Sequence, residues 1–345
     1  MRLSVVIATY NRPQLLQRLL AQLEQQTFRD FEVIVVDDGS KPEAAVEGAK
    51  VRVLRQANPG PAAARHAGVL AASGEIVVIL DDDMQVGPDF LAAHDRGHGG
   101  AHSVVLGRIR ADPDLARMPL FERWHAYLLD VKAEKIRAGK LKARGDLLFT
   151  GNASFDRADY LAVGGFDPSL AQSEDIELGM RLEKAGATFH FSEDAWTLHG
   201  SDHTSLRRWR DRARRYGACD LRIGRKHPDL PTSSPWRLLI ELNPITRAFV
   251  AVSIASPVIA GFLATLAIRA AMAFDKLGLE RVAFAGTSLA YSMEYFRGVR
   301  YETGSIAGAI RELWSFAARN GRTSPPGWRS IKATNGIDGS GSLQS

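Results

Sequence analysis

Short apolar runs alternate with amphipathic segments through the N-terminal part of the chain. Such runs are typical of buried strands, whereas leucine or alanine at helical spacing indicates a helix that packs on one face. The predicted strands are Leu3 to Ala8, Glu32 to Val36, Val51 to Arg55 and Glu75 to Leu80, and the predicted helices are Pro13 to Gln26, with Asn11 as N-cap, and Pro61 to Ala72. Alternating strands and helices predict an α/β fold with a mostly parallel sheet.

The pattern becomes less regular beyond Gly107. Leu115 to Leu141 predicts an amphipathic helix interrupted at Pro119, and its apolar side carries Phe121, Trp124, Tyr127 and Leu128. Further along, Ile176 to Ala185 predicts a helix and Ala195 to Leu198 a strand.

The chain changes character from Ser233 onward. Ala248 to Ile268 contains 21 residues without a charge, and about 20 residues are needed to cross a bilayer. A buried helical hairpin in a soluble domain is the alternative for this segment. The apolar stretch Val282 to Met293 is too short to span alone, and the tail from Thr323 is rich in Gly, Ser and Pro, which predicts disorder.

Composition narrows the class of protein. The 345 residues are 45% hydrophobic, which is ample for a core, and the single cysteine, Cys219, excludes an intramolecular disulfide. No N-terminal run is long enough for a secretion signal, so we expect a cytoplasmic location. The net charge of +5 is concentrated between Arg207 and Arg215, where the arginines either hold a pyrophosphate, contact anionic lipid or form a solvated helical face. Trp209 and Tyr216 in the same stretch suit a membrane interface.

Three acidic residues, Asp81, Asp82 and Asp83, follow an apolar strand directly. Like charges at the end of a buried strand are unfavourable unless a cation is present, and a hard divalent metal is the simplest candidate. A solvated acidic turn is the alternative. Ala8 to Arg12 and Asp37 to Ser40 also follow predicted strands, and ligands bind beyond the carboxyl ends of parallel strands. One pocket could therefore collect all three segments.

Several motifs extend this pattern in a fixed order. They are Val5 to Arg12, Val35 to Ser40, Asn58 to Gly60 with Ala64 and Arg65, Asp81 to Asp83, Gly151 to Phe155, Gly164 to Asp167, Ser173 to Leu178, and His199. In order and spacing they resemble the family-2 glycosyltransferases of GT-A fold, over roughly residues 2 to 230. The resemblance implies a Rossmann-like sheet flanked by helices.

The resemblance also implies an organisation into domains. A glycosyltransferase domain is expected over 1–230, with nucleotide binding over about 1–107 and acceptor binding over about 108–230. A helical, membrane-associated region of one or two transmembrane helices would follow over 231–322, and a disordered tail over 323–345. Such a protein would act at the cytoplasmic side of the cell membrane.

The resemblance assigns a donor site and a metal site. Asp81, Asp83 and His199 would hold Mn2+ or Mg2+, and a metal neutralises a departing diphosphate without proton transfer. Imidazole favours Mn2+ over Mg2+, although a lone histidine is often structural. The nucleoside-diphosphate sugar would contact Ala8, Thr9, Tyr10, Arg12, Asp38, Arg65, Asp81 and Asp82. An ordinary Asp-Gly turn is the alternative for Asp38.

The resemblance makes Asp175 the general base of an inverting transfer, with Asn152, Glu174 and Trp124 in acceptor binding. A carboxylate must take the proton of the acceptor hydroxyl as the anomeric carbon is attacked. Acids at the start of a helix also interact favourably with the helix dipole, which is the alternative for Glu174 and Asp175.

The expected reaction is transfer of a sugar to a hydroxyl of a lipid-linked or cell-surface glycan, with a membrane surface as partner and no role for nucleic acid. A polyprenyl-phosphate sugar transferase, a sugar-phosphate nucleotidyltransferase and a silent glycan-binding protein are the rivals. The sequence departs from the family at His66, where Asn is frequent, and at Ser173, where Gly or Thr is frequent. The Q-x-x-R-W element of polysaccharide synthases is not evident, the nearest stretch being 206–209, so long-chain polymerisation is not expected.

Overall fold

The structure is a computed structural model that describes residues 1–46, 50–200, 204–230, 232 and 234–320. It divides into two compact units. Unit 1 comprises Met1–Ala116 and Ala126–Asp202, and unit 2 comprises Arg117–His125 and His203–Ser345. The predicted disordered tail, 323–345, lies outside the described residues.

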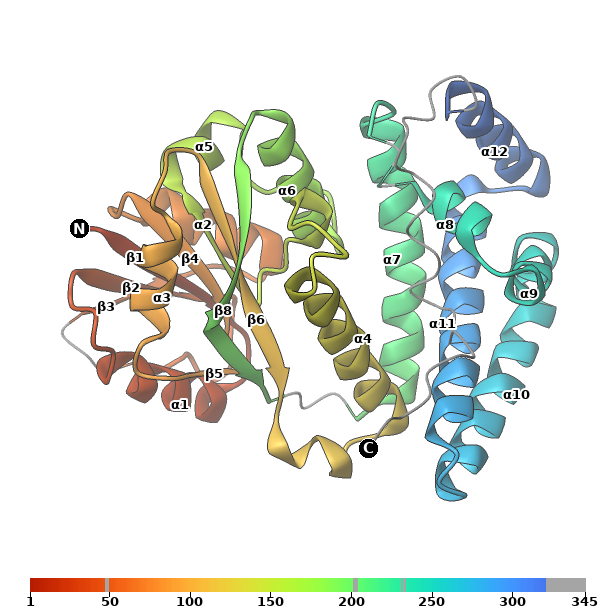
Figure 1. Cartoon of the computed structure of the whole chain (residues 1–345), viewed down its shortest axis with the longest axis horizontal. Coiled ribbons are helices and arrows are strands. Elements are labelled where there is room, and N and C mark those ends of the chain that lie inside the picture. The colour runs from red at the N-terminus through yellow and green to blue at the C-terminus, as the bar shows by residue number, and fades with distance from the viewer. Residues whose placement is uncertain (47–49, 201–203, 231, 233, 321–345) are drawn as a thin grey trace. The chain divides into compact units, whose positions relative to one another are not determined.

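Unit 1 is built around an eight-stranded sheet (Figure 1). Its strands are β1 (Leu3–Thr9), β2 (Phe31–Asp37), β3 (Val51–Arg55), β4 (Ile76–Asp81), β5 (Met84–Val86), β6 (Ser103–Ala111), β7 (Asn152–Asp156) and β8 (Thr188–His199). The spatial order is β3-β2-β1-β4-β7-β6-β8-β5. The first four strands of that order are parallel, β7 runs antiparallel to both its neighbours, β6 pairs with β8 in parallel, and β5 is antiparallel to β8.

Helices cover both faces of this sheet. They are α1 (Pro13–Glu24), α2 (Pro61–Ala71), α3 (Phe90–Gly97), α5 (Arg157–Ala162) and α6 (Glu174–Lys184), with short 3-10 turns at Pro113–Arg117 and Gly145–Leu147. Side chains alternate between the faces of a strand, so Val5 and Ile7 of β1 pack with α1 and α3 while Val6 packs with α2, α5 and α6. The helix α4 (Leu120–Arg137) begins in unit 2 and continues into unit 1.

The predicted α/β fold class is confirmed, and the six N-terminal elements lie within two residues of their predicted limits. Asn11 is not the N-cap of α1, because the cap position falls on Arg12. Asn11 instead adopts a φ of 55° and accepts a hydrogen bond from the Lys41 amide at 2.8 Å. The elements β5, α3 and β6 were not predicted. In β6 the residues Arg108 and Arg110 interrupt the apolar pattern that marks the other strands.

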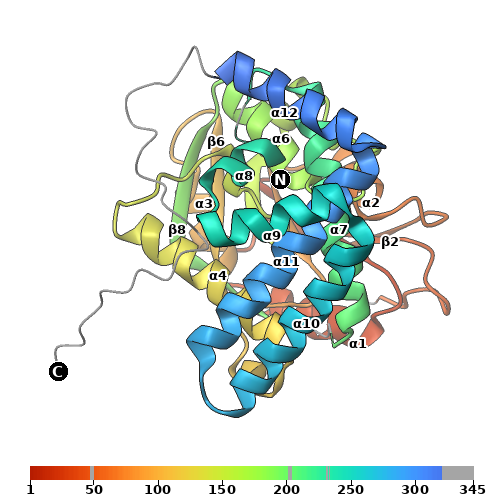
Figure 2. The same ribbon diagram turned by 90° about the vertical axis from the view of Figure 1, so that its right-hand side faces the viewer.

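Unit 2 is helical (Figure 2). Besides the first residues of α4, it contains α7 (Leu206–Lys226), α8 (Pro235–Glu241), α9 (Pro244–Ala255), α10 (Pro257–Lys276), α11 (Glu280–Thr303) and α12 (Ile306–Asn320). The helix α7 therefore belongs to unit 2, whereas the domain boundary expected from the sequence is at residue 230. Close packing between α7 and α11 depends on glycine, because a Cβ at Gly217 would lie 1.9 Å from the Tyr295 carbonyl oxygen.

The predicted 21-residue apolar span is not one helix. The helix α9 ends at Ala255, and Ser256 takes an extended conformation as N-cap of α10. Pro257 explains the break, because proline disfavours helical geometry in the residue before it. Among the described residues, α10 alone is long and apolar enough to cross a membrane, judged by length and composition. The second apolar stretch, 282–293, lies inside α11, where Ala283, Ala290 and Met293 are buried.

The arginine cluster of α7 is largely committed to ion pairs inside unit 2. Glu294 of α11 is fully buried, and Arg210 and Arg214 both bind its carboxylate. Arg212 lies 3.5 Å from Glu122. These three arginines therefore do not form the solvated or anion-binding face considered from the sequence. Trp209 is also buried, in an aromatic cluster, so its predicted place at a membrane interface is wrong.

Candidate active site

The polar residues that follow β1, β2 and β4 come together at one edge of the sheet. The parallel register pairs Thr9 with Asp37 and Ala8 with Asp81. Side chains from three separate motifs therefore lie side by side, as expected for the carboxyl ends of parallel strands.

Asp82 joins the ends of β1 and β4. Its carboxylate accepts a hydrogen bond from Thr9 Oγ1 at 2.7 Å and one from Arg12 at 3.1 Å. Burial raises the pKa of Asp82 to about 6, and the charge of Asp83 adds to the rise while Thr9 and Arg12 oppose it. Asp82 is only 4% exposed, so its main contacts are inside the protein.

Asp83 and His199 are neighbours because β5 pairs with β8. Met84 lies opposite His199 in that ladder, and the distance from His199 Nε2 to Asp83 Oδ2 is 3.7 Å. Arg12 also binds Asp83 Oδ2, at 3.1 Å. Within the residues that the structure describes, no three His, Cys, Asp or Glu side chains converge on one point that could hold a metal. Asp83 and His199 are thus close enough to supply two ligands to one metal ion. The predicted third ligand, Asp81, is not grouped with them.

Arg65 connects the acidic cluster to α6. Its guanidinium donates to Asp81 Oδ1 at 2.7 Å and to Glu174 Oε1 at 2.8 Å. Arg65 is buried, which by itself lowers its pKa, but the charges of Asp81 and Glu174 hold the pKa above its ordinary value. Gly151 packs against the same place, since a Cβ there would lie 3.3 Å from Asp81 Oδ2. Arg65 is therefore a fixed cation between two acidic motifs.

Asp175 lies next to this bridge at the first turn of α6. Its carboxylate accepts hydrogen bonds from the amides of Ile176 at 2.8 Å and Thr150 at 3.4 Å. Burial and the charge of Glu174 together raise the pKa of Asp175 to about 7, against the opposing effect of the two amides and Arg65. A carboxyl group with this pKa can exchange a proton near neutral pH.

The turn before α6 is shaped by Ser173, which has a left-handed φ of 63°. Glycine adopts this region without strain, so the frequent Gly of the family at this position has a structural reason.

The two acids after β2 have different surroundings. Asp37 accepts hydrogen bonds from the amides of Ser40 and Ala44, and these outweigh burial and lower its pKa. Asp38 accepts from Gln56 Nε2 at 2.8 Å and from the Gly60 amide at 3.2 Å. Asp37 therefore stabilises the turn, and Asp38 links it to the loop before α2.

Comparison with known proteins gives this site a family. Residues 4–150 match the model of "Glycosyl transferase family 2", which covers the strand ends and the acidic cluster. This segment belongs to glycosyl transferase family 2. A validoxylamine A glucosyltransferase of Streptomyces hygroscopicus subsp. jinggangensis is 30% identical, across 68% of this chain and 63% of the relative. A pre-mycofactocin glycosyltransferase of Mycobacterium tuberculosis is 31% identical, across 66% of this chain and 48% of the relative. The chain thus spans less than two thirds of the length of these relatives.

A solved structure confirms the fold of this chain. The mannosyltransferase PcManGT from Pyrobaculum calidifontis, solved in complex with GDP-Man and Mn2+, superposes with a TM-score of 0.55 and 20% identity. The match covers 91% of this chain and 87% of the mannosyltransferase. At this identity the likeness supports the GT-A fold and nothing more specific.

Three residues that the sequence predicts to bind the acceptor have other contacts. Asn152 is buried, and its side-chain amide binds His94 Nε2 and the Ala195 carbonyl oxygen. Glu174 is engaged by Arg65. Trp124 is 5% exposed and packs on Trp209 and Tyr291 in unit 2. The structure therefore gives Asn152 and Trp124 roles in packing, contrary to the prediction.

Three residues expected to contact the donor lie at or just beyond the end of β1. Ala8 and Thr9 end β1, and the Tyr10 side chain is 48% exposed at the same edge. Sequence reasoning missed Gln56, which binds Asp38, and Thr150, whose amide binds Asp175. It also missed Lys132, although the spacing of Leu129, Lys132, Ala133 and Ile136 places this lysine on an apolar helix face.

Proposed function

We propose that the protein transfers a sugar from a nucleoside-diphosphate sugar to a hydroxyl group of an acceptor, with inversion at the anomeric carbon. The observation that carries this proposal is the environment of Asp175. Its carboxyl group has a pKa raised to about 7 and lies at the end of a bridge through Glu174 and Arg65 to Asp81. A general base is most effective when its pKa is close to the working pH.

In the proposed reaction, the Asp175 carboxylate takes the proton of the acceptor hydroxyl. The hydroxyl oxygen forms a bond to the anomeric carbon while the bond from that carbon to the diphosphate oxygen breaks. The diphosphate leaves with the electron pair of the broken bond. Attack from the face opposite the diphosphate inverts the configuration of the anomeric carbon. The reaction needs no oxidant or reductant, and no substrate besides the donor and the acceptor.

The donor would lie at the strand ends of unit 1. Asp38, which accepts hydrogen bonds from Gln56 and Gly60, would contact the nucleoside. Arg12 and Arg65 would supply positive charge at the edge where the diphosphate would lie. Electrostatic groups that are already in place before the reaction need no rearrangement as charge develops. The mannosyltransferase of similar fold was solved with GDP-Man, which supports a nucleotide sugar as donor.

Asp83 and His199 would hold Mn2+ or Mg2+. A divalent ion would neutralise the charge that develops on the leaving diphosphate. The 3.7 Å separation of the two side chains supports this assignment, and so does the Mn2+ in the structure of the mannosyltransferase. Imidazole and carboxylate together suit Mn2+ better than Mg2+.

The acceptor would be lipid-linked or lie at the cell surface, and unit 2 would contact the cytoplasmic side of the membrane. The helix α10 supports this proposal, because one side of it packs within unit 2 through Ala260, Ala264 and Ile268. Its other side exposes Val258 at 81%, Ile259 at 55%, Phe262 at 64% and Leu266 at 46%. Exposed apolar residues gathered on one helix face mark an interaction surface.

The test compares Asp175→Asn with the unchanged protein in reactions with a panel of nucleotide sugars and Mn2+, by following the release of nucleoside diphosphate. We expect the variant to lose about 100-fold or more in rate while its affinity for the nucleotide stays the same. Asp194→Asn, at a side chain that is 79% exposed, is the matched control and should keep full activity. Full activity in Asp175→Asn would refute the base, and retained transfer to a phosphate acceptor would favour a polyprenyl-phosphate sugar transferase. Release of pyrophosphate from a nucleoside triphosphate would instead indicate a nucleotidyltransferase.

A further inference from the structure

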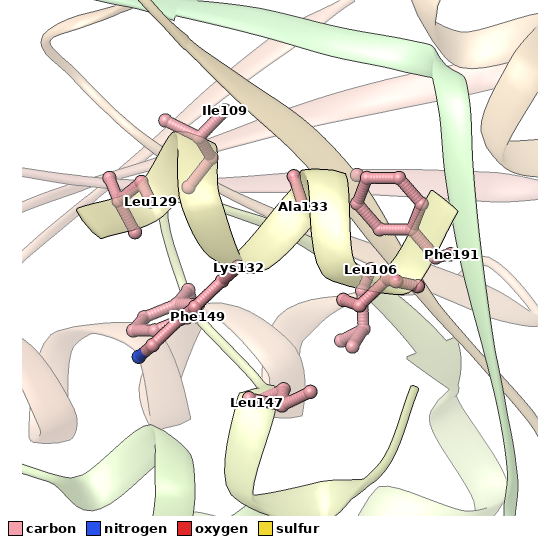
Figure 3. Close-up of a pocket in the computed structure, with 10 residues that line it drawn as sticks. Leu106, Ile109, Leu129, Lys132, Ala133, Leu147, Phe149 and Phe191 are labelled. Atoms are coloured by element: carbon pink, nitrogen blue, oxygen red, sulfur yellow. The ribbon is translucent and has the colours of Figure 1, made fainter. Parts of the chain in front are cut away.

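Unit 1 contains an apolar pocket that the donor site does not use. It lies between α4, the strands β6 and β8, and the segment just before β7 (Figure 3). Its volume is about 410 Å³, including the part open to solvent. Apolar side chains supply most of the wall, among them Leu106, Ile109, Leu129, Leu147 and Phe191. Several of these side chains stay partly exposed, so a ligand could bury more of their surface.

Lys132 is the charged residue among the described residues that line this pocket. Figure 3 shows its side chain extending from α4 toward Phe149, and its Nζ lies 5.1 Å from the centre of that ring. The structure gives this ammonium group no hydrogen bond or ion pair with the described residues. Burial lowers the pKa of Lys132, while the charges of Asp146 and Asp175 act in the opposite direction. An ammonium group that is partly removed from water gains from an oxygen acceptor.

The pocket adjoins the proposed base. Phe149, which lines it, precedes Thr150 in the chain, and the Thr150 amide donates to Asp175 Oδ2 at 3.4 Å. Asp146, an acid whose charge acts on Lys132, forms its ion pair with Arg144. Lys132 is therefore available to an anionic group in the pocket. A molecule whose hydroxyl group reaches Asp175 could therefore place its neighbouring atoms in this pocket.

We infer that the pocket receives an apolar portion of the acceptor, and that Lys132 binds an anionic oxygen of a carboxylate or phosphate ester beside it. This inference rests on the proposed function, because it places the acceptor relative to Asp175. It narrows the acceptor to an amphipathic molecule that has an apolar group and an anionic group close to the reacting hydroxyl. A free, uncharged sugar would leave both the apolar wall and the ammonium group without a partner.

The test is calorimetric titration of the full chain with hexyl phosphate, hexanoate, butyl phosphate, hexanol and inorganic phosphate. We expect hexyl phosphate or hexanoate to bind, and the one that binds more tightly identifies the anionic group. Butyl phosphate, which is two methylenes shorter, should bind about fifteenfold more weakly than hexyl phosphate, since each methylene contributes about fourfold. Hexanol and inorganic phosphate should each bind at least tenfold more weakly than the tighter anion.

Two substitutions change the two features of the pocket separately. Lys132→Met keeps the apolar stem and removes the charge, so it should weaken binding of the anionic probes at least tenfold and leave hexanol unchanged. Ala133→Leu fills the pocket and should weaken all the alkyl probes. Lys135→Met, on the same helix and outside the pocket, is the matched control and should bind like the unchanged protein. Thermal melts check that each variant is folded.

The outcome is separable from the proposed function. Release of nucleoside diphosphate from a nucleotide sugar, measured without acceptor, does not require this pocket. The inference is overturned if that release occurs but neither hexyl phosphate nor hexanoate binds. It is also overturned if Lys132→Met and Ala133→Leu bind both probes as tightly as the unchanged protein does. In either case the glycosyltransferase assignment stands.

Discussion

The guanidinium of Arg65 donates a 2.7 Å hydrogen bond to Asp81 Oδ1, and this contact fixes the orientation of the acid at the end of β4. The same guanidinium binds Glu174, the residue before the proposed base. One buried cation therefore sets the position of an acid at the end of β4 and an acid at the start of α6. Arg65 and Arg12 offset part of the negative charge gathered after β4.

Replacing Arg65 with methionine should destabilise the fold, because Glu174 would be left buried without its ion-pair partner and Asp81 would lose its own. Breaking a buried pair by removing one member costs about 3 kcal/mol. The free energy of unfolding, measured in urea, checks this expectation. Arg137→Met, which removes an exposed pair with Glu134, is the control and should change that free energy by about 0.5 kcal/mol or less.

Asn152→Ala should destabilise the protein without a specific effect on acceptor binding. The substitution removes the amide that binds His94 and the Ala195 carbonyl oxygen inside the sheet. A buried polar group left without its partner costs about 2 kcal/mol. Chemical denaturation measures the free energy of unfolding, and the KM for the acceptor measures the effect on acceptor binding. A raised KM with unchanged stability would restore the acceptor-binding role predicted from the sequence.

How much the sequence reveals depends on whether a residue's role is local. The strand ends at Thr9 and Asp81 are visible because an apolar run gives way to polar residues, and the parallel direction of the strands follows from the alternation of strands and helices. The ion pair between Arg65 and Glu174 joins residues far apart in the chain, so no local pattern signals it. Asn152 carries a polar side chain whose burial the sequence does not reveal.

In the apolar segment of unit 2, by contrast, a local signal is present in the sequence but is outweighed by the overall hydropathy. The sequence contains Pro257, a sign of a helix boundary, but uniform apolar composition from 248 to 268 outweighs one proline when hydropathy alone is considered. The structure resolves the conflict in favour of the proline, because Ser256 caps a new helix. Likewise, Arg210 and Arg214 suggest a charged surface, whereas a buried glutamate on another helix binds both.

Asp83→Asn should weaken binding of a nucleoside diphosphate in the presence of Mn2+ about tenfold or more, which corresponds to about 1.4 kcal/mol. The reason is that an amide is a poorer ligand for a divalent ion than a carboxylate. Calorimetric titration of GDP and UDP, with Mn2+ and with a chelator, provides the measurement. Asp89→Asn, near the start of α3, is the control variant. Equal affinity with metal and with chelator would remove the metal from the proposed site.

The double variant Phe262→Ser and Leu266→Ser should lower the fraction of protein that pellets with vesicles containing anionic lipid. Both side chains are exposed on α10, and burying them in lipid is favourable in proportion to their apolar area. Leu70→Ser with Leu161→Ser, at exposed leucines of unit 1, is the matched control and should pellet like the unchanged protein. Unchanged pelleting of the α10 variant would argue against a membrane contact through this helix.

The pH dependence of nucleoside diphosphate release, in the unchanged protein and in Glu174→Gln, tests the role of Asp175 most directly. A base works in its ionised form, so the rate should rise with pH through about 7, the value to which burial and Glu174 raise the pKa of Asp175. Glutamine removes the like charge beside Asp175 and can still accept a hydrogen bond from Arg65. The account predicts that the midpoint of the profile moves to lower pH in Glu174→Gln. A midpoint that stays the same in that variant would contradict it.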